Sequence, residues 1–262
     1  MKKEILILVK TYPEISRKYI ETVCVAGILK DTLEMIRIYP IRFRYIDKKK
    51  QFKKYDLIRI DVQDKSAHDN RPESFTVDPY STEIIEREEG KAQWGRRCKY
   101  VLNSPHVFDD VESLKSLQKE KNISLGIIKP SQDIKFRIEK RPKDELKVSE
   151  IKKRSVLDQG DLFEDIKNLE AIPYRFKVNF KCQNSECNGH EMSILDWEIA
   201  ELYRKCKNKK NWEELIIDKL ESLCDFKKRD PYFILGNMNH WRHIFCVLGI
   251  FYPPRERQGE LF

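Results

Sequence analysis

Three short runs between residues 21 and 62 alternate apolar and polar side chains with a period of two. They span Thr22–Ile28, Met35–Tyr39 and Leu57–Val62, and each is bounded by Gly, Pro, Asp or a lysine cluster. Period-two alternation turns one face of a segment inward and the other toward solvent, which is typical of antiparallel strands. The sequence therefore predicts a small curved sheet near the start of the chain.

The polar face of these predicted strands is rich in arginine, and a basic connection joins the second strand to the third. A sheet that presents cations to solvent is typical of a nucleic-acid surface, although ordinary solubilising charges would give the same pattern. We expect phosphate contacts from Arg37, Arg42, Arg44, Lys53, Lys54 and Arg59.

The net charge also favours a polyanionic partner. The 262 residues include 51 Lys and Arg against 43 Asp and Glu, which gives +8. No apolar run approaches the length of a membrane span, and the start, MKKEILILVK, is interpreted as a first strand at Ile5–Val9 rather than a signal peptide. Seven cysteines spread along the chain do not make a secreted disulfide framework. We expect a globular, cytoplasmic protein with no membrane association.

The loop after this first strand interleaves cations with aromatic rings. Lys10 and Tyr12 could grip a phosphate and stack on a base, an interaction worth roughly 1–3 kcal/mol per base. The alternative is that the tyrosines of this loop cap one end of a barrel.

Residues 75–141 predict a second small barrel. A short helix is possible at Ser81–Gly90 and another is expected at Val111–Lys121, followed by strands at Ser124–Pro130 and Ile134–Lys140. Short strands mixed with one or two helices and frequent turns favour this arrangement.

Five short motifs follow one another along residues 1–140: CVAG at Cys24–Gly27, IRIYP at Ile36–Pro40, DLIRI at Asp56–Ile60, RPES at Arg71–Ser74 and SLGII at Ser124–Ile128. Together they resemble the dual OB-fold-containing domain family of bacterial proteins. Met35 replaces an aromatic residue of that family, and Glu73-Ser74 replaces a Glu-Asn pair. The resemblance implies paired OB-like barrels, a fold that often binds single strands or oligonucleotides.

A polar connector at residues 146–165 separates the expected paired barrels, 1–145, from an αβ domain at 166–262. This domain begins with a strand at Tyr174–Phe180 and continues into the turn KCQNSECNGH. Cys182, Cys187 and His190 have spacings that can close on one tetrahedral Zn²⁺, with free cysteines beside a structural histidine as the alternative. Candidates for a fourth ligand are Cys206, His240, His243 and Cys246, and we assign Cys206.

Two helices follow the turn, one capped by Ser193 with Asp196 and one at Trp212–Cys224. The basic segment Lys205–Lys210 lies between them. His190, Asp196 and Glu198 are weak catalytic candidates for a metal-dependent nuclease. Side chains two apart on a helix point about 200 degrees apart, so the two carboxylates should not converge.

The last apolar runs, Tyr232–Leu235 and Ile244–Phe251, predict a long hairpin around the loop Gly236–His243. His240, Trp241 and Arg242 at its tip can stack on bases and donate hydrogen bonds, although a core position for Trp241 is the alternative.

The chain ends on QGELF, which resembles the short peptide by which bacterial proteins dock on the replication sliding clamp. That resemblance implies a polar contact for Gln258 and an apolar pocket for Leu261 and Phe262. Gln159–Phe163 repeats the pattern inside the connector, where Leu162 and Phe163 could instead anchor the second core.

These patterns and the resemblance to the dual OB-fold family together predict an α+β protein with two small OB-like β-barrels followed by a smaller αβ unit with a zinc site and a terminal β-hairpin. The expected function is non-catalytic nucleic-acid binding in bacterial DNA processing or defence, with DNA favoured over RNA and single strands included. The alternatives are a metal-dependent nuclease using the C-terminal domain and a protein–protein adaptor.

Overall fold

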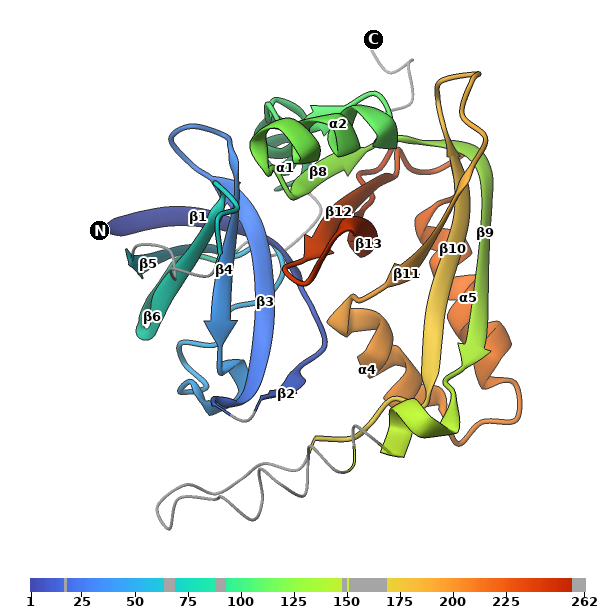
Figure 1. The fold of residues 1–262 in the computed structure, drawn as a ribbon, viewed down its shortest axis with the longest axis horizontal. Coiled ribbons are helices and arrows are strands. Elements are labelled where there is room, and N and C mark those ends of the chain that lie inside the picture. The colour runs from blue at the N-terminus through green and yellow to red at the C-terminus, as the bar shows by residue number, and fades with distance from the viewer. Residues whose placement is uncertain (17, 64–68, 88–92, 148–149, 151–168, 256–262) are drawn as a thin grey trace, which may run out of the picture.

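A closed five-stranded barrel packs against a seven-stranded sheet that carries helices on its other side (Figure 1). The computed structural model describes residues 1–16, 18–63, 69–87, 93–147, 150 and 169–255. None of the helices in those ranges is long and apolar enough to cross a membrane.

The barrel closes because its first strand pairs on both sides. β1 (Lys2–Lys10) runs antiparallel to β3 (Ile20–Leu29) and to β5 (Leu57–Gln63). β4 (Met35–Ile41) pairs antiparallel with β3, and β6 (Ser74–Glu86) pairs antiparallel with β5 and parallel with β4. The short β2 (Glu14–Ser16) adds to β3, and a 3₁₀ turn, η1 (Phe43–Tyr45), follows β4.

The predicted alternation sets the barrel interior. Every second residue of the three predicted strands points inward, as with Val23 and Val25 of β3 and Ile36 and Ile38 of β4. These strands are confirmed. The outer face of the barrel is only partly exposed to solvent. Leu6 and Leu8 of β1 and Ala26 and Ile28 of β3 form a second core there, against the larger sheet. The middle of β1, Ile5–Val9, is entirely apolar because both of its faces are buried.

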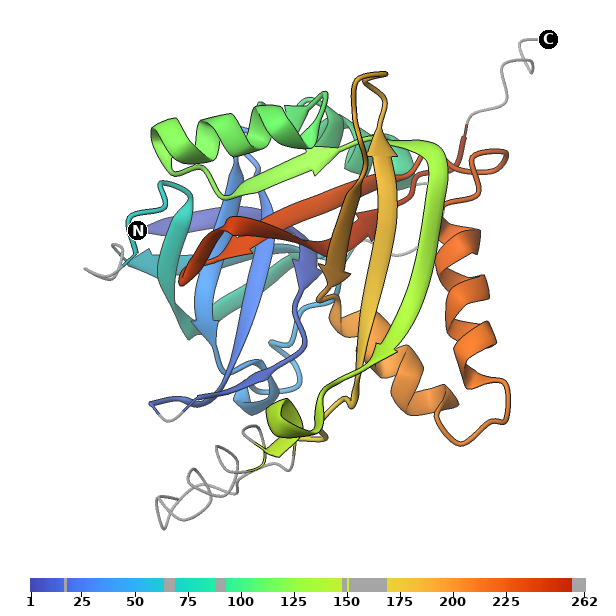
Figure 2. The same ribbon diagram turned by 45° about the vertical axis from the view of Figure 1, so that its right-hand side comes forward.

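The larger sheet has the order β7-β8-β12-β13-β11-β10-β9. Figure 2 shows β9 and β10 upright at the front, with β12 and β13 running across the molecule. The β7–β8 and β11–β13 pairs are parallel and the remaining pairs are antiparallel. The strands are β7 (Val107–Phe108), β8 (Leu125–Ile128), β9 (Pro130–Lys140), β10 (Tyr174–Cys182), β11 (His190–Ile194), β12 (Tyr232–Met238) and β13 (Trp241–Phe251).

The expected second barrel over residues 75–141 is wrong. β8 pairs with β12 and β9 pairs with β10, so both strands belong to the larger sheet. β8 cannot line a small separate barrel because both its faces are already covered: Leu125 and Ile127 face the first barrel, while Ile128 faces the opposite core. The helix considered at Ser81–Gly90 is also wrong, since β6 continues as a strand to Glu86.

Among the described residues, α1, α2, α4 and α5 cover the edges and far face of this sheet. α1 (Trp94–Leu102) and α2 (Val111–Lys121) lie over one end, and Asp110 caps α2 by accepting from the Ser113 amide at 2.8 Å. α4 (Trp197–Cys206) and α5 (Trp212–Leu223) bury Ile199, Tyr203, Ile216 and Leu220 against the sheet. The N-cap of α4 is Asp196; Ser193, expected in that role, lies in β11.

The barrel and the larger sheet pack closely against each other. The backbone N–H of Tyr12 donates to Leu195 O at 3.1 Å, which ties the end of β1 to the segment between β11 and α4. Gly249 of β13 lies so close to β1 that an added Cβ would stand 2.4 Å from Val9 Cγ1. Only a residue without a side chain permits this approach.

Candidate functional site

Three metal-ligand side chains meet at the turn between β10 and β11. His190 Nε2 lies 3.2 Å from Cys187 Sγ and 3.4 Å from Cys182 Sγ, and the three atoms lie within 4.8 Å of one another. The predicted convergence of Cys182, Cys187 and His190 is therefore confirmed as a group that could hold a metal ion.

The hairpin positions these donors by local geometry. Cys182 ends β10, His190 begins β11, and Cys187 lies in the turn, with its Sγ accepting the Cys182 amide at 3.3 Å. Gly189, between Cys187 and His190, has φ +96°, a conformation that side-chain-bearing residues rarely adopt. The turn that brings the donors together therefore depends on this glycine.

Burial disfavours the thiolate form of Cys182 when no cation is present. Burial raises the pKa of Cys182 to about 12, although a backbone hydrogen bond from Val111 at the start of α2 acts in the opposite direction. Burial, followed by the charge on Lys115, lowers the pKa of His190. Metal ligation requires thiolate and neutral imidazole. The lowered pKa of His190 favours its neutral form, whereas the thiols would lose their protons when a metal binds.

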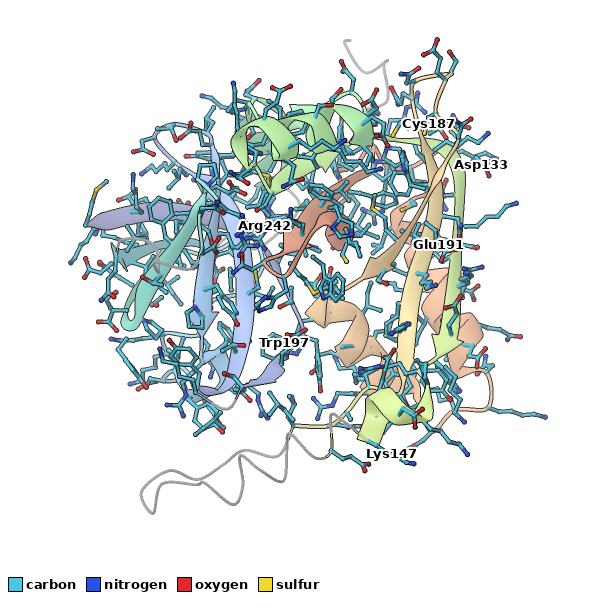
Figure 3. The ribbon with its side chains drawn as sticks, in the orientation of Figure 1. Asp133, Lys147, Cys187, Glu191, Trp197 and Arg242 are labelled. Carbon is cyan, nitrogen blue, oxygen red and sulfur yellow. The ribbon has the colours of Figure 1, made fainter. Side chains whose placement is uncertain are left out.

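Cys206 does not join this group among the residues that the structure describes. It is buried at the end of α4, where its carbonyl accepts from the Lys209 amide. Its assignment as fourth ligand is wrong, because α4 runs away from the hairpin turn. Figure 3 shows Cys187 at the turn and Trp197, the first residue of α4, well separated from it.

A second group of predicted residues meets in a cleft of about 830 Å³ between the barrel and the αβ half. Lys54 Nζ donates to Glu198 Oε2 at 3.1 Å and to Ile250 O at 3.0 Å. Lys10 lines the same cleft, as does the buried Asp196. The sequence placed these residues in three unrelated segments.

Lys10 is held in an aromatic cage at the end of β1. Its ammonium lies 4.1 Å from the centre of the Phe43 ring and 5.7 Å from that of Trp197, and it donates to Phe52 O at 2.7 Å. Burial lowers its pKa to about 8. Tyr12 packs edge-on against Trp197 and against the core of the larger sheet, and its hydroxyl donates to Glu170 O at 2.9 Å.

Asp196 has two roles in the cleft. Its Oδ1 accepts the Glu198 amide at 2.8 Å as the N-cap of α4, and its charge faces Lys54. Burial raises its pKa to about 6, and Lys54 only partly opposes this rise. Burial opposes the charge on Lys54 as well, but Tyr55, Glu198 and Asp196 raise its pKa above the ordinary value.

The three weak catalytic candidates are divided between these sites. His190 belongs to the cysteine cluster, whereas Asp196 and Glu198 face lysines in the cleft. A nuclease centre built from all three is therefore not assembled in the described residues. The expectation that the two carboxylates diverge is wrong, because both line the cleft and act on Lys54. Asp196 is the N-cap and has an extended backbone, so the angle between two helical positions does not apply to this pair.

Arg37 is not on a solvent-facing surface. Its side chain is buried, with 3% of the residue exposed, because β8 covers this part of β4. Its guanidinium donates to Ser124 Oγ at 2.9 Å, Ser124 O at 3.3 Å and Cys24 Sγ at 3.2 Å. Ser124 in turn donates its amide to Glu73 Oε1 at 2.6 Å and its hydroxyl to the same oxygen.

This buried network contains residues of four of the five motifs named above: Cys24–Gly27, Ile36–Pro40, Arg71–Ser74 and Ser124–Ile128. Arg71 extends it by donating to Asn237 O at 3.1 Å and pairing with Asp69. The motifs therefore meet where the barrel joins the larger sheet.

The remaining barrel cations have acidic or aromatic neighbours. Arg44 pairs with Glu21, and Arg59 bridges Glu4 at 2.6 Å and Glu83 at 3.1 Å. Arg42 stacks over Tyr45 with its guanidinium carbon 4.5 Å from the ring centre. Lys53 is exposed at the cleft.

The tip of the β12–β13 hairpin is exposed, as expected of a binding loop. Trp241 is 55% exposed, so the core position considered for it is wrong, and His240 beside it is exposed too. Arg242 donates to Asn239 Oδ1 at 2.9 Å and to Asn70 in the β5–β6 connection. Figure 3 shows Arg242 next to the barrel. The strands continue further than expected and leave only Asn239 and His240 as the turn.

Sequence reasoning missed Glu73, Ser124 and Asn237, and also the cleft residues Arg97 and Trp197. Their neighbours in space lie far away along the chain, so only the RPES and SLGII motifs marked any of them. The clamp-like residues Gln258, Leu261 and Phe262, and the internal copy at 159–163, lie outside the described residues.

Two family models cover the chain and overlap at residues 83–103. Residues 1–103 match a domain of unknown function, DUF8758. No match was found among curated proteins. Residues 83–262, most of the chain, match a second domain of unknown function, and the protein therefore belongs to the DUF8757 family.

Proposed function

We propose that this protein is a non-catalytic nucleic-acid-binding protein whose barrel is of the OB type. The strand order carries the proposal. Numbered along the chain, the five barrel strands have the cyclic order 1-2-3-5-4, with strands 3 and 5 parallel. This is the Greek-key order of the OB fold, which binds oligonucleotides across strands 2–3 and through the loops between strands 1–2 and 4–5. The motif resemblance to dual OB-fold proteins supports the same assignment for residues 1–87.

The hairpin tip supports binding beside one of those loops. Arg242 contacts Asn70, and Arg71 contacts Asn237, so the tip is fastened to the connection between β5 and β6, the fourth and fifth barrel strands. Trp241 then offers an exposed ring next to this loop. Aromatic rings near cations bind single strands by stacking, without a requirement for base identity.

The ion pairs and burial of the barrel arginines favour a nucleic-acid-binding surface other than the arginine-rich strand face expected from the sequence. Arg44 and Arg59 are compensated by carboxylates, and Arg37 is buried, so these residues contribute little to an external field. We propose that Trp241, His240 and Arg242 contact the nucleic acid directly, with the net charge of +8 providing long-range attraction.

Fluorescence anisotropy with labelled oligonucleotides tests this proposal. Trp241→Ala should weaken binding to single strands about 5- to 150-fold, which corresponds to the 1–3 kcal/mol of one stacked base. Tyr80→Ala is the matched control, because Tyr80 is 56% exposed but lies on β6. DNA and RNA, single and double strands, are compared at two salt concentrations. Equal losses in the two variants, or no salt-dependent binding in the unmodified chain, would refute the proposal.

We also propose that the cysteine cluster holds a structural Zn²⁺. With Zn–S near 2.3 Å and Zn–N near 2.0–2.1 Å, tetrahedral ligands would have S and N atoms about 3.6 Å apart. The observed separations of 3.2 and 3.4 Å need only a small expansion to accept the ion. Two thiolates and one imidazole are a donor set that suits zinc, which would then cross-link the ends of β10 and β11.

A further inference from the structure

We propose that the cleft between the barrel and the αβ half binds a nucleotide: an aromatic base carrying phosphate. This site is separate from the hairpin tip and does not depend on nucleic-acid binding there. Its volume of about 830 Å³ lies within the range of small-molecule sites.

Charge complementarity indicates an anionic ligand. Three carboxylates, those of Asp196, Glu198 and Glu201, line the cleft, against six cations, which leaves an excess of three positive charges. The cations are Lys10, Lys53, Lys54, Arg97, Lys205 and Lys219.

The aromatic lining indicates a ligand with a flat ring. Tyr55, Trp94 and Tyr252 form one connected set, with the Trp94 ring centre 5.6 Å from each of the other two. Phe43 and Trp197 form another at 5.5 Å. All five rings line the cleft, together with apolar side chains such as Leu202 and Leu223. Rings beside cations suit a base next to its phosphates.

The carboxylates distinguish a nucleotide from a fatty acid of similar size. Glu198 is exposed, and Lys54 is its described partner, so it retains oxygens that can accept hydrogen bonds from ribose hydroxyls or base N–H groups. A fatty acid has no donor for them. The ligand therefore combines an anionic group, a ring and hydrogen-bond donors.

Two cations at the mouth are free to meet the phosphates. Lys205 of α4 and Lys219 of α5 are exposed, and neither forms an ion pair with any residue that the structure describes. Lys54 is already engaged by Glu198 and Ile250. The rim lysines thus offer charge that substitution can remove without disturbing the fold.

Calorimetric titration of the full chain with ATP, ADP and AMP tests the proposal, with adenosine, inorganic triphosphate and decanoate as comparison probes. Nucleotides should bind more tightly than each comparison probe. The double variant Lys205→Glu/Lys219→Glu should weaken ATP binding about tenfold or more, since two charges at the mouth are reversed.

The matched control is Lys209→Glu/Lys210→Glu, the same charge change on the exposed α4–α5 connection outside the cleft lining. It should leave ATP binding within about twofold, and Trp241→Ala should also leave it unchanged. Absence of nucleotide binding at about 1 mM, preference for decanoate, or equal losses in both double variants would overturn the proposal.

Discussion

Replacing Arg37 tests whether the buried network holds the barrel to the larger sheet. Arg37→Met retains the length and apolar stem of the side chain but removes its hydrogen bonds to Ser124 and Cys24. It also leaves the Glu73 carboxylate buried without the nearby cation. Removing one partner of a buried charged network costs about 3–5 kcal/mol, so we expect a loss of about 4 kcal/mol in the free energy of unfolding.

A double-mutant cycle separates this loss from simple packing effects. Glu73→Gln keeps the shape of the carboxylate and removes its charge. If Arg37 and Glu73 act through Ser124, the double variant should be less destabilised than the sum of the single variants by about 1–3 kcal/mol. Urea unfolding, followed by circular dichroism and tryptophan fluorescence, provides these free energies.

Arg59→Met is the control, because Arg59 makes its ion pairs with Glu4 and Glu83 at the surface. Its cost should stay at about 1 kcal/mol or below. If Arg37→Met costs no more than Arg59→Met, or if the cycle is additive, the network does not stabilise the junction.

Three further predictions concern the other sites. Asp196→Asn keeps a good N-cap but cannot ionise, whereas the pKa of Asp196 in the folded protein is raised to about 6 from an ordinary 3.8. The unmodified protein should therefore lose stability relative to this variant as the pH rises from about 4 through 6. Urea midpoints of the two proteins that run parallel over that pH range would contradict this. Cys187→Ser should abolish a stoichiometric zinc content and lower the melting temperature, whereas Cys98→Ser should keep the metal; zinc-free unmodified protein, by elemental analysis after chelator-free purification, would exclude the site. Deleting residues 258–262 should leave the melting temperature unchanged and remove binding to a bacterial sliding clamp by surface plasmon resonance, and a large drop in melting temperature would indicate a structural role instead.

Local pattern was sufficient for elements whose partners lie nearby along the chain. The alternation at 22–28, 35–39 and 57–62 identified barrel strands because a period of two depends only on which face is buried. Helix α2 matched its predicted bounds, since Asp110 caps it through the Ser113 amide only three residues away. The metal-ligand cluster was also predictable, because its three donors lie within nine residues of one hairpin.

Strand partners and burial of the outer barrel face were decided only by tertiary packing. Alternation shows which residues share a face but not which strand lies beside them, so β8 and β9 were assigned to a second barrel instead of the larger sheet. For the same reason Arg37 could not be recognised as buried, because its cover, β8, lies about ninety residues further along. The cleft depends on long-range packing most of all. Its cations and rings come from β1, the β4–β5 connection, α1, α4, α5 and the segment after β13, and only the folded chain brings them together.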